Sequence, residues 1–282
     1  MTTLLLCAFY ALFVWWFATG LILFLDQLPR ETHGRSTMAA AALSGAAALG
    51  LAWSAGETTI AASLCAFTCA LAIWGFNELT FLTGAVTGPR KEASPPGTPP
   101  LARTRHAIEA ILWHELALLA GFALVLVLTW GGPNQIAAWT YGLLWVMRLS
   151  AKINIHLGVP NHAEEFLPPH LAYLKSWFTR KPMNPFFPVS VSAATVALAL
   201  IASAALAPGA TPHEQAAYGL VGALLALAIL EHWFLVMPFQ SIALWRFAAR
   251  DTSAETPVPR REPDPAPAPV ETKPAAFSLW RR

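Results

Sequence analysis

The chain has 282 residues, of which 56% are hydrophobic and 12% are charged, and its formal net charge is only +2. Soluble domains carry about 25% charged residues, so this composition argues against a soluble globular enzyme. The basic residues do not gather on one surface patterned for nucleic acid, which argues against that class of partner as well.

Seven segments have the length of a membrane-spanning helix, which needs about 20 mostly apolar residues. They cover residues 3–25, 37–55, 58–83, 107–130, 135–157, 188–207 and 214–247. The first lacks the basic start of a secretory signal, so we expect it to remain as a span. The sequence therefore predicts an all-α, polytopic membrane bundle of about seven transmembrane helices.

Lysine and arginine residues follow the predicted topology. The connections near residues 57, 131–135 and 208–214 hold none of them, and the alternate connections, with the helix ends beside them, hold all 18. Basic residues concentrate on the cytoplasmic side of a membrane. We therefore expect a periplasmic N-terminus and a cytoplasmic C-terminus.

Proline-rich stretches divide the rest of the chain. Residues 1–250 are predicted to form the membrane domain, with a cytoplasmic Pro-rich linker at about 87–105 and a cytoplasmic loop at 158–187. Residues 251–282 are rich in proline and charge. Such a segment cannot bury enough apolar surface to order itself, so we expect a disordered cytoplasmic tail, and mobility at residues 89–100 as well.

Ionisable side chains lie inside the predicted spans, where they are costly and usually functional. Counted from the predicted helix ends, all fall in the cytoplasmic half of the membrane. These intramembrane residues are Glu78, His114, Glu115, Arg148, Lys152, Glu231 and His232, with the amide Asn154 beside them. The next loop adds Glu164, Glu165 and His170, which we expect to cover this polar layer on its cytoplasmic side.

Three interpretations of the polar layer are open. Helix bundles build di-iron sites from inward-facing Glu and His, so one is a metal site. Its candidate ligands are Glu78, His114, Glu115, Glu164, Glu165, His170, Glu231 and His232. The second is an ion-pair network in which Arg148 and Lys152 neutralise Glu78 and Glu115, with Asn154 as a further polar partner. The third is a histidine that binds the central metal of a tetrapyrrole.

Several long blocks of the sequence are distinctive. They are residues 77–90, 113–116, 145–154, 158–161, 164–166, 170–174, 183–184 and 231–232. Together they resemble the photosynthetic complex assembly proteins of the PuhE type from purple photosynthetic bacteria, and the resemblance extends from residue 1 to about 249. It implies a protein of the bacterial inner (intracytoplasmic) membrane that assists assembly of the reaction centre and light-harvesting apparatus, or modulates bacteriochlorophyll supply. It brings no defined catalytic residues.

Two main functions follow from these observations. The first is an assembly factor without turnover, whose partners are reaction-centre or light-harvesting subunits, or pigment-biosynthesis enzymes, in the lipid membrane. The alternative is a membrane di-iron-type oxidoreductase in bacteriochlorophyll or tetrapyrrole biosynthesis, with a metal or a bacteriochlorophyll-type tetrapyrrole as cofactor. A transporter or pigment carrier is less favoured, because the sequence contains no internal repeat of the kind transporters use.

Overall fold

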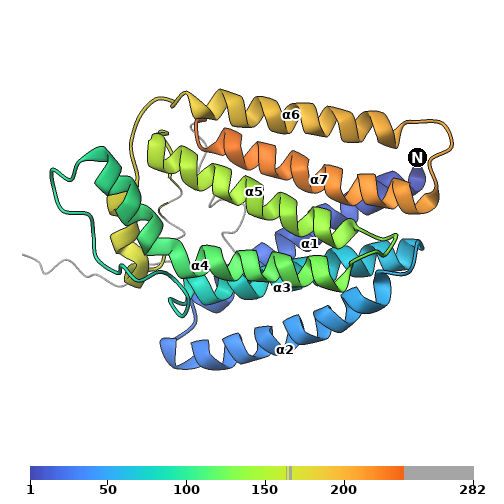
Figure 1. Cartoon of the computed structure of the whole chain (residues 1–282), viewed down its shortest axis with the longest axis horizontal. Coiled ribbons are helices and arrows are strands. Elements are labelled where there is room, and N and C mark those ends of the chain that lie inside the picture. Colours follow the sequence, from blue (N-terminus) through green and yellow to red (C-terminus); the bar gives the residue numbers. More distant parts are fainter. Residues whose placement is uncertain (163, 165–166, 238–282) are drawn as a thin grey trace, which may run out of the picture. The chain divides into compact units, whose positions relative to one another are not determined.

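The computed structural model describes residues 1–162, 164 and 167–237, and this part of the chain contains helices and no β-strand. Its long helices run back and forth in alternating directions, side by side (Figure 1). They are α1 (Thr2–Asp26), α2 (Arg30–Ser54), α3 (Ile60–Leu82), α4 (Pro100–Leu128), α5 (Ile136–Leu157), α6 (Phe186–Ala205) and α7 (Pro212–Phe234). A 3-10 helix, η2 (Pro169–Trp177), lies between α5 and α6.

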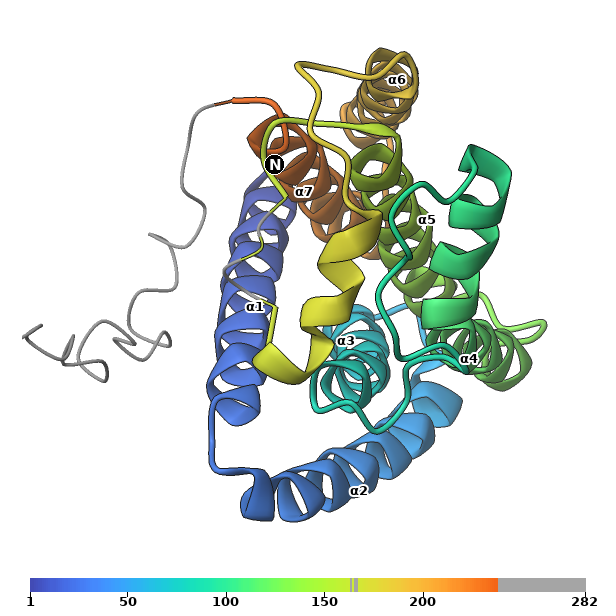
Figure 2. The same cartoon turned by 90° about the vertical axis from the view of Figure 1, so that its left-hand side faces the viewer.

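Six of these helices are long and apolar enough to cross a membrane. The exception is α5, which carries Arg148 and Lys152 and is therefore less apolar, although it lies alongside the other six (Figures 1 and 2). The prediction of an all-α, multi-pass membrane bundle is confirmed.

Local sequence signals start two of the helices, α3 and α7, on the side of the bundle that holds the N-terminus. The Thr59 hydroxyl accepts a hydrogen bond from the Ala62 N–H and caps α3. Thr211 and Glu214 form a capping box at the start of α7, with Pro212 at the first helical position. These caps satisfy N–H groups that a helix leaves unpaired at its start.

Helix bounds differ from the predicted spans at several ends. The second helix begins at Arg30 rather than at residue 37, and the fourth at Pro100 rather than at 107, so the linker predicted over 87–105 ends earlier. Apolar runs mark only the part of a helix that lies in hydrocarbon, whereas the helix continues through polar turns beyond it. The end of the predicted span 214–247 and the predicted tail lie outside the described residues.

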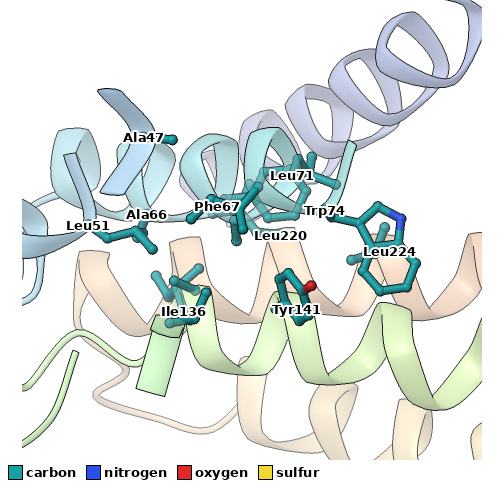
Figure 3. Packing of buried hydrophobic residues seen from close by; sticks show 14 of the residues in the cluster. Ala47, Leu51, Ala66, Phe67, Leu71, Trp74, Ile136, Tyr141, Leu220 and Leu224 are labelled. Atoms are coloured by element: carbon teal, nitrogen blue, oxygen red, sulfur yellow. The ribbon is translucent and has the colours of Figure 1, made fainter. Parts of the chain in front are cut away.

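Helix α3 is the centre of the bundle. Figure 2, which looks along the helices, shows it between α1, α2, α4 and α5. Half of its apolar span is buried, against 11% for α1 and for α2. Its side chains Phe67, Leu71 and Trp74 pack with Tyr141 of α5 and Leu224 of α7 in the main core (Figure 3). The site residues on α3 are therefore held by neighbours on every side.

The segment that follows α3 docks onto α4. The Thr87 carbonyl accepts a hydrogen bond of 2.8 Å from the backbone N–H of His114, in the middle of α4. Gly88 lies so close to α4 that a Cβ at this position would be 2.1 Å from the Glu109 carbonyl oxygen. A helix bends where an outside group inserts into its ladder of hydrogen bonds, and α4, whose His114 N–H bonds to the Thr87 carbonyl, is bent (Figure 1).

The proline-rich segment beyond it contains no helix, and one of its backbone groups contacts η2. The Ser94 N–H donates a hydrogen bond of 2.9 Å to the Ser176 hydroxyl. The predicted mobility of residues 89–100 stays a prediction.

Candidate functional site

Glu78 is the centre of the polar layer, near the end of the central helix α3. Its side chain is buried, and its two carboxylate oxygens face different helices. Arg148 Nη2, on α5, lies 3.6 Å from Glu78 Oε2, and His114 Nε2, on α4, lies 3.8 Å from Glu78 Oε1. Three helices thus place an acid, a guanidinium and an imidazole together.

His114 is 1% exposed and its ring lies against Phe81, with 4.3 Å between the ring centroids. Both of its ring nitrogens, and Glu78 Oε1, are buried without a hydrogen-bond partner. Buried polar atoms without partners are rare in proteins. This pair of side chains is therefore a polar feature that packing alone does not explain.

Glu115 and Lys152 form a second, separate pair. Lys152 Nζ lies 2.6 Å from Glu115 Oε1, and the Trp145 indole N–H donates a hydrogen bond of 3.2 Å to Glu115 Oε2. Both carboxylate oxygens are thereby satisfied. A charge in hydrocarbon is tolerated when it is paired and hydrogen-bonded in this way.

Among the residues that the structure describes, Glu231 has no ion-pair partner within 4.0 Å, and it lines a cavity of about 140 Å³ between α1, α3, α5 and α7. Glu78 and Arg148 line the same cavity. His232, the next residue, is instead buried on another side of α7, because successive helical residues point about 100° apart. Its Nε2 is 2.9 Å from the Ser150 hydroxyl, and its Nδ1 is 2.8 Å from the Ala228 carbonyl.

Asn154 belongs to an amide network that joins α5 to the start of α6. Its Nδ2 donates to the Ser150 carbonyl at 3.0 Å and to the Ser190 hydroxyl at 3.2 Å. The Asn184 side chain donates in turn to the Asn154 Oδ1 at 3.0 Å and to the Gly158 carbonyl at 3.0 Å. Asn154 thus fixes the turn after α5, and its contacts are not with a carboxylate.

The two described loop residues contact groups other than Glu78. The Glu164 carboxylate lies 2.8 Å from Arg180 Nη2 and 3.2 Å from His162 Nδ1. The hydrogen bond from His162, and then the one from Arg180, lower the pKa of Glu164. His170 Nε2 lies 2.8 Å from the Leu82 carbonyl at the end of α3. Glu165 lies outside the described residues.

The contacts give no support to a metal centre. Among residues 1–162, 164 and 167–237, no group of three His, Cys, Asp or Glu side chains is placed to hold a metal ion. The structure instead pairs Glu78 with Arg148 and Glu115 with Lys152, as the ion-pair interpretation expects.

Some residues that shape the site carry no charge and were not predicted. Phe81 and the Thr87 carbonyl hold His114, Trp145 satisfies Glu115, and Ser150 binds His232. Trp145 had a usable signal, because it lies one helical turn before Arg148 and two turns before Lys152 on the same helix and can reach the same neighbour. The other three depend on how the helices are rotated against one another.

His170 gives a pH prediction outside the spans. Burial lowers the pKa of His170, and the positive charges of Arg30 and His33 lower it further, while the hydrogen bond to Leu82 opposes them. A depressed folded pKa means that the stabilising contribution is complete above the ordinary value of about 6.5 and is lost as pH falls through the folded value. In an NMR titration, the His170 resonance, assigned by its loss in His170→Gln, is expected to titrate below the ordinary value. A midpoint at or above 6.5 would contradict this.

Comparison with known proteins places the chain in a family. A curated protein of Rhodobacter capsulatus, described as "Uncharacterized 30.4 kDa protein in puhA 5'region", is 38% identical over 267 residues, which are 92% of this chain and 97% of that protein. No solved structure shows significant similarity to the chain. Residues 1–256 match the family described as "Protein of unknown function (DUF3623)". The chain therefore belongs to the DUF3623 family.

Proposed function

We propose that this protein is a membrane assembly factor for the photosynthetic apparatus, acting on reaction-centre or light-harvesting subunits without turning over a substrate. The observation that carries the proposal is the relative from Rhodobacter capsulatus, whose gene lies in the puhA 5' region, a photosynthesis gene region. The resemblance of the 77–90 and 145–154 blocks to the PuhE type points to the same context.

The surface of the bundle supports a role in which membrane proteins are bound. Large apolar side chains are exposed along the outer helices, and on α2 they include Met38, Leu43, Leu49 and Trp53. Such faces contact lipid or the helices of other membrane proteins, where packing drives association. The connections on one side of the bundle are short, so most of the described mass lies at membrane depth.

The proposal includes a location in the inner (intracytoplasmic) membrane, with the N-terminus periplasmic and the C-terminus cytoplasmic. The distribution of all 18 lysine and arginine residues supports this orientation. Alkaline phosphatase is expected to be active when fused after Pro133 and inactive when fused after Arg250, and a cytoplasmic reporter is expected to give the reverse. Equal signals from both sites, or the opposite pattern, would reject the topology.

The function is tested by complementation. A Rhodobacter capsulatus strain without the 38% identical relative is expected to contain less assembled reaction centre and light-harvesting complex, measured by near-infrared absorbance of isolated membranes. The present chain is expected to restore that absorbance. The same strain with the empty vector is the control.

Pigment analysis of the same strain separates assembly from catalysis. An assembly factor predicts lower levels of complex without a single accumulated precursor of bacteriochlorophyll. Accumulation of one precursor, consumed when the chain is restored, would contradict the assembly proposal and assign an enzymatic step. Unchanged complexes and unchanged pigment would remove the link to photosynthesis.

A further inference from the structure

The cavity between α1, α3, α5 and α7 is amphipathic. Its walls are mostly apolar and include Trp15, Leu71, Trp74 and Leu224. Three of these, Leu71, Trp74 and Leu224, lie together at one end of the core (Figure 3). Its polar groups are supplied mainly by Glu78, Arg148 and Glu231, which come from three different helices. Ligand sites commonly combine apolar walls with a few convergent polar groups in this way.

The volume of the cavity sets the size of its occupant. At about 140 Å³, it is close to an apolar cavity of about 150 Å³ that binds benzene. One six-membered ring fits such a space. A tetrapyrrole macrocycle, which joins four rings, is larger than this enclosed volume.

Charge neutrality decides which chemical group the cavity can receive. The guanidinium of Arg148 balances one carboxylate, that of Glu78, at 3.6 Å. An uncompensated charge is costly at membrane depth, so the neutral state of the cluster places a proton on the second carboxyl, that of Glu231. The cavity then offers N–H donors from Arg148 and an O–H donor from Glu231, and a ligand must supply acceptors.

Access to the cavity is from the bundle surface. The side chain of Arg148 lines the cavity and is 50% exposed. Among the described residues, the guanidinium has one carboxylate within 4.0 Å, so it retains donors for a ligand. At this depth the surrounding solvent is lipid, and the ligand must therefore be lipophilic.

We propose that this cavity binds the head group of a lipid quinone, a six-membered ring with two carbonyl acceptors and an isoprenoid tail that remains in the membrane. The ring occupies the space beside Trp74 and Leu224, and its carbonyl groups accept hydrogen bonds from Arg148 and Glu231. This is a binding site independent of the assembly role, and its failure leaves that role untouched.

The test uses the full chain in phosphatidylcholine vesicles, titrated with decylubiquinone. Quinones quench tryptophan fluorescence, and a site beside Trp15 and Trp74 predicts a saturable component above the linear quenching caused by partition into lipid. We expect this component in the wild type. Ala18→Phe, which fills the cavity from α1, is expected to remove it, while Ala42→Phe, the same change at an exposed position of α2, leaves it intact.

Two variants at one position test the hydrogen bond. Glu231→Gln keeps an N–H donor and is expected to retain affinity within about twofold, whereas Glu231→Leu removes the donor and is expected to weaken binding about tenfold. Circular dichroism of each variant checks that it folds. The two Glu231 variants do not fill the cavity. Comparing their affinities therefore tests the proposal even if Ala18→Phe does not fold.

Three results with decylubiquinone would overturn the proposal. They are the absence of a saturable component in the wild type, an unchanged component in Ala18→Phe, and equal affinity in Glu231→Leu and Glu231→Gln. Decylamine, which has the same ten-carbon tail and a cationic head, is the matched ligand control. Loss of the saturable decylubiquinone component when decylamine is added would mean that decylamine takes the site and that Glu231 is ionised, and would also overturn the proposal.

Discussion

Lys152→Met is expected to lower the free energy of unfolding by about 3 kcal/mol, because it leaves the Glu115 carboxylate without its cation. Lys152 Nζ is 2.6 Å from Glu115 Oε1, and both side chains are largely withdrawn from the surface. Removing one partner of such a pair costs more than the pair itself contributes, since the remaining charge stays buried. Unfolding in rising proportions of sodium dodecyl sulfate, followed by circular dichroism, measures the change.

A double-mutant cycle with Glu115→Gln is the control. The glutamine keeps an oxygen that accepts the Trp145 N–H but carries no charge. The double variant is therefore expected to be more stable than Lys152→Met alone, by about 1–2 kcal/mol. Additive losses in the two single variants would mean that Lys152 and Glu115 do not interact, and would contradict the ion-pair network.

The helices could be predicted from the sequence because each contains a long run of mostly apolar residues. Their ends could not. The first turn of α2, from Arg30, is polar, and hydropathy does not separate a helix in the interface from a loop. The 3-10 helix Pro169–Trp177 was also not predicted. It is held by the packing of Leu171, Leu174 and Trp177 on α4, and its sequence has no helical periodicity that would reveal it.

The pairing of charges could also be anticipated. Arg148 and Lys152 are four residues apart, so they lie on one face of α5, and the buried acids Glu78 and Glu115 need cations at the same depth. The sequence could not show which of the eight candidate ligands lie close together. The rotation of α7 directs Glu231 to the cavity and His232 to Ser150, and the loop contacts of Glu164 are with His162 and Arg180.

A shared depth in the membrane therefore does not show that side chains form one site. Counting residues places side chains at one level of the membrane, but helix rotation decides which of them meet. Here it separates one polar layer into the Glu78 group beside the cavity and the Glu115–Lys152 pair. The separation explains how the bundle can hold these charged groups at membrane depth, since each described acid of these two pairs has a cation within 4.0 Å.

The docking of residues 87–88 onto α4 positions His114 beside Glu78, and Gly88 makes that docking possible. A control is available in Gly45, on α2, where a Cβ would meet nothing within 4 Å. Gly45→Ala is expected to be neutral or to stabilise by up to about 1 kcal/mol, because alanine favours a helix over glycine.

Gly88→Ala is expected to destabilise the bundle by about 3 kcal/mol or to prevent folding. The added Cβ would lie 2.1 Å from the Glu109 carbonyl oxygen and 2.6 Å from that of Ala110, which are backbone atoms that cannot turn aside. The segment must then move away from α4 and give up the hydrogen bond from the His114 N–H to the Thr87 carbonyl. The same detergent unfolding assay compares Gly88→Ala with Gly45→Ala, and equal stability of the two variants would show that residues 87–88 do not dock on α4 as described.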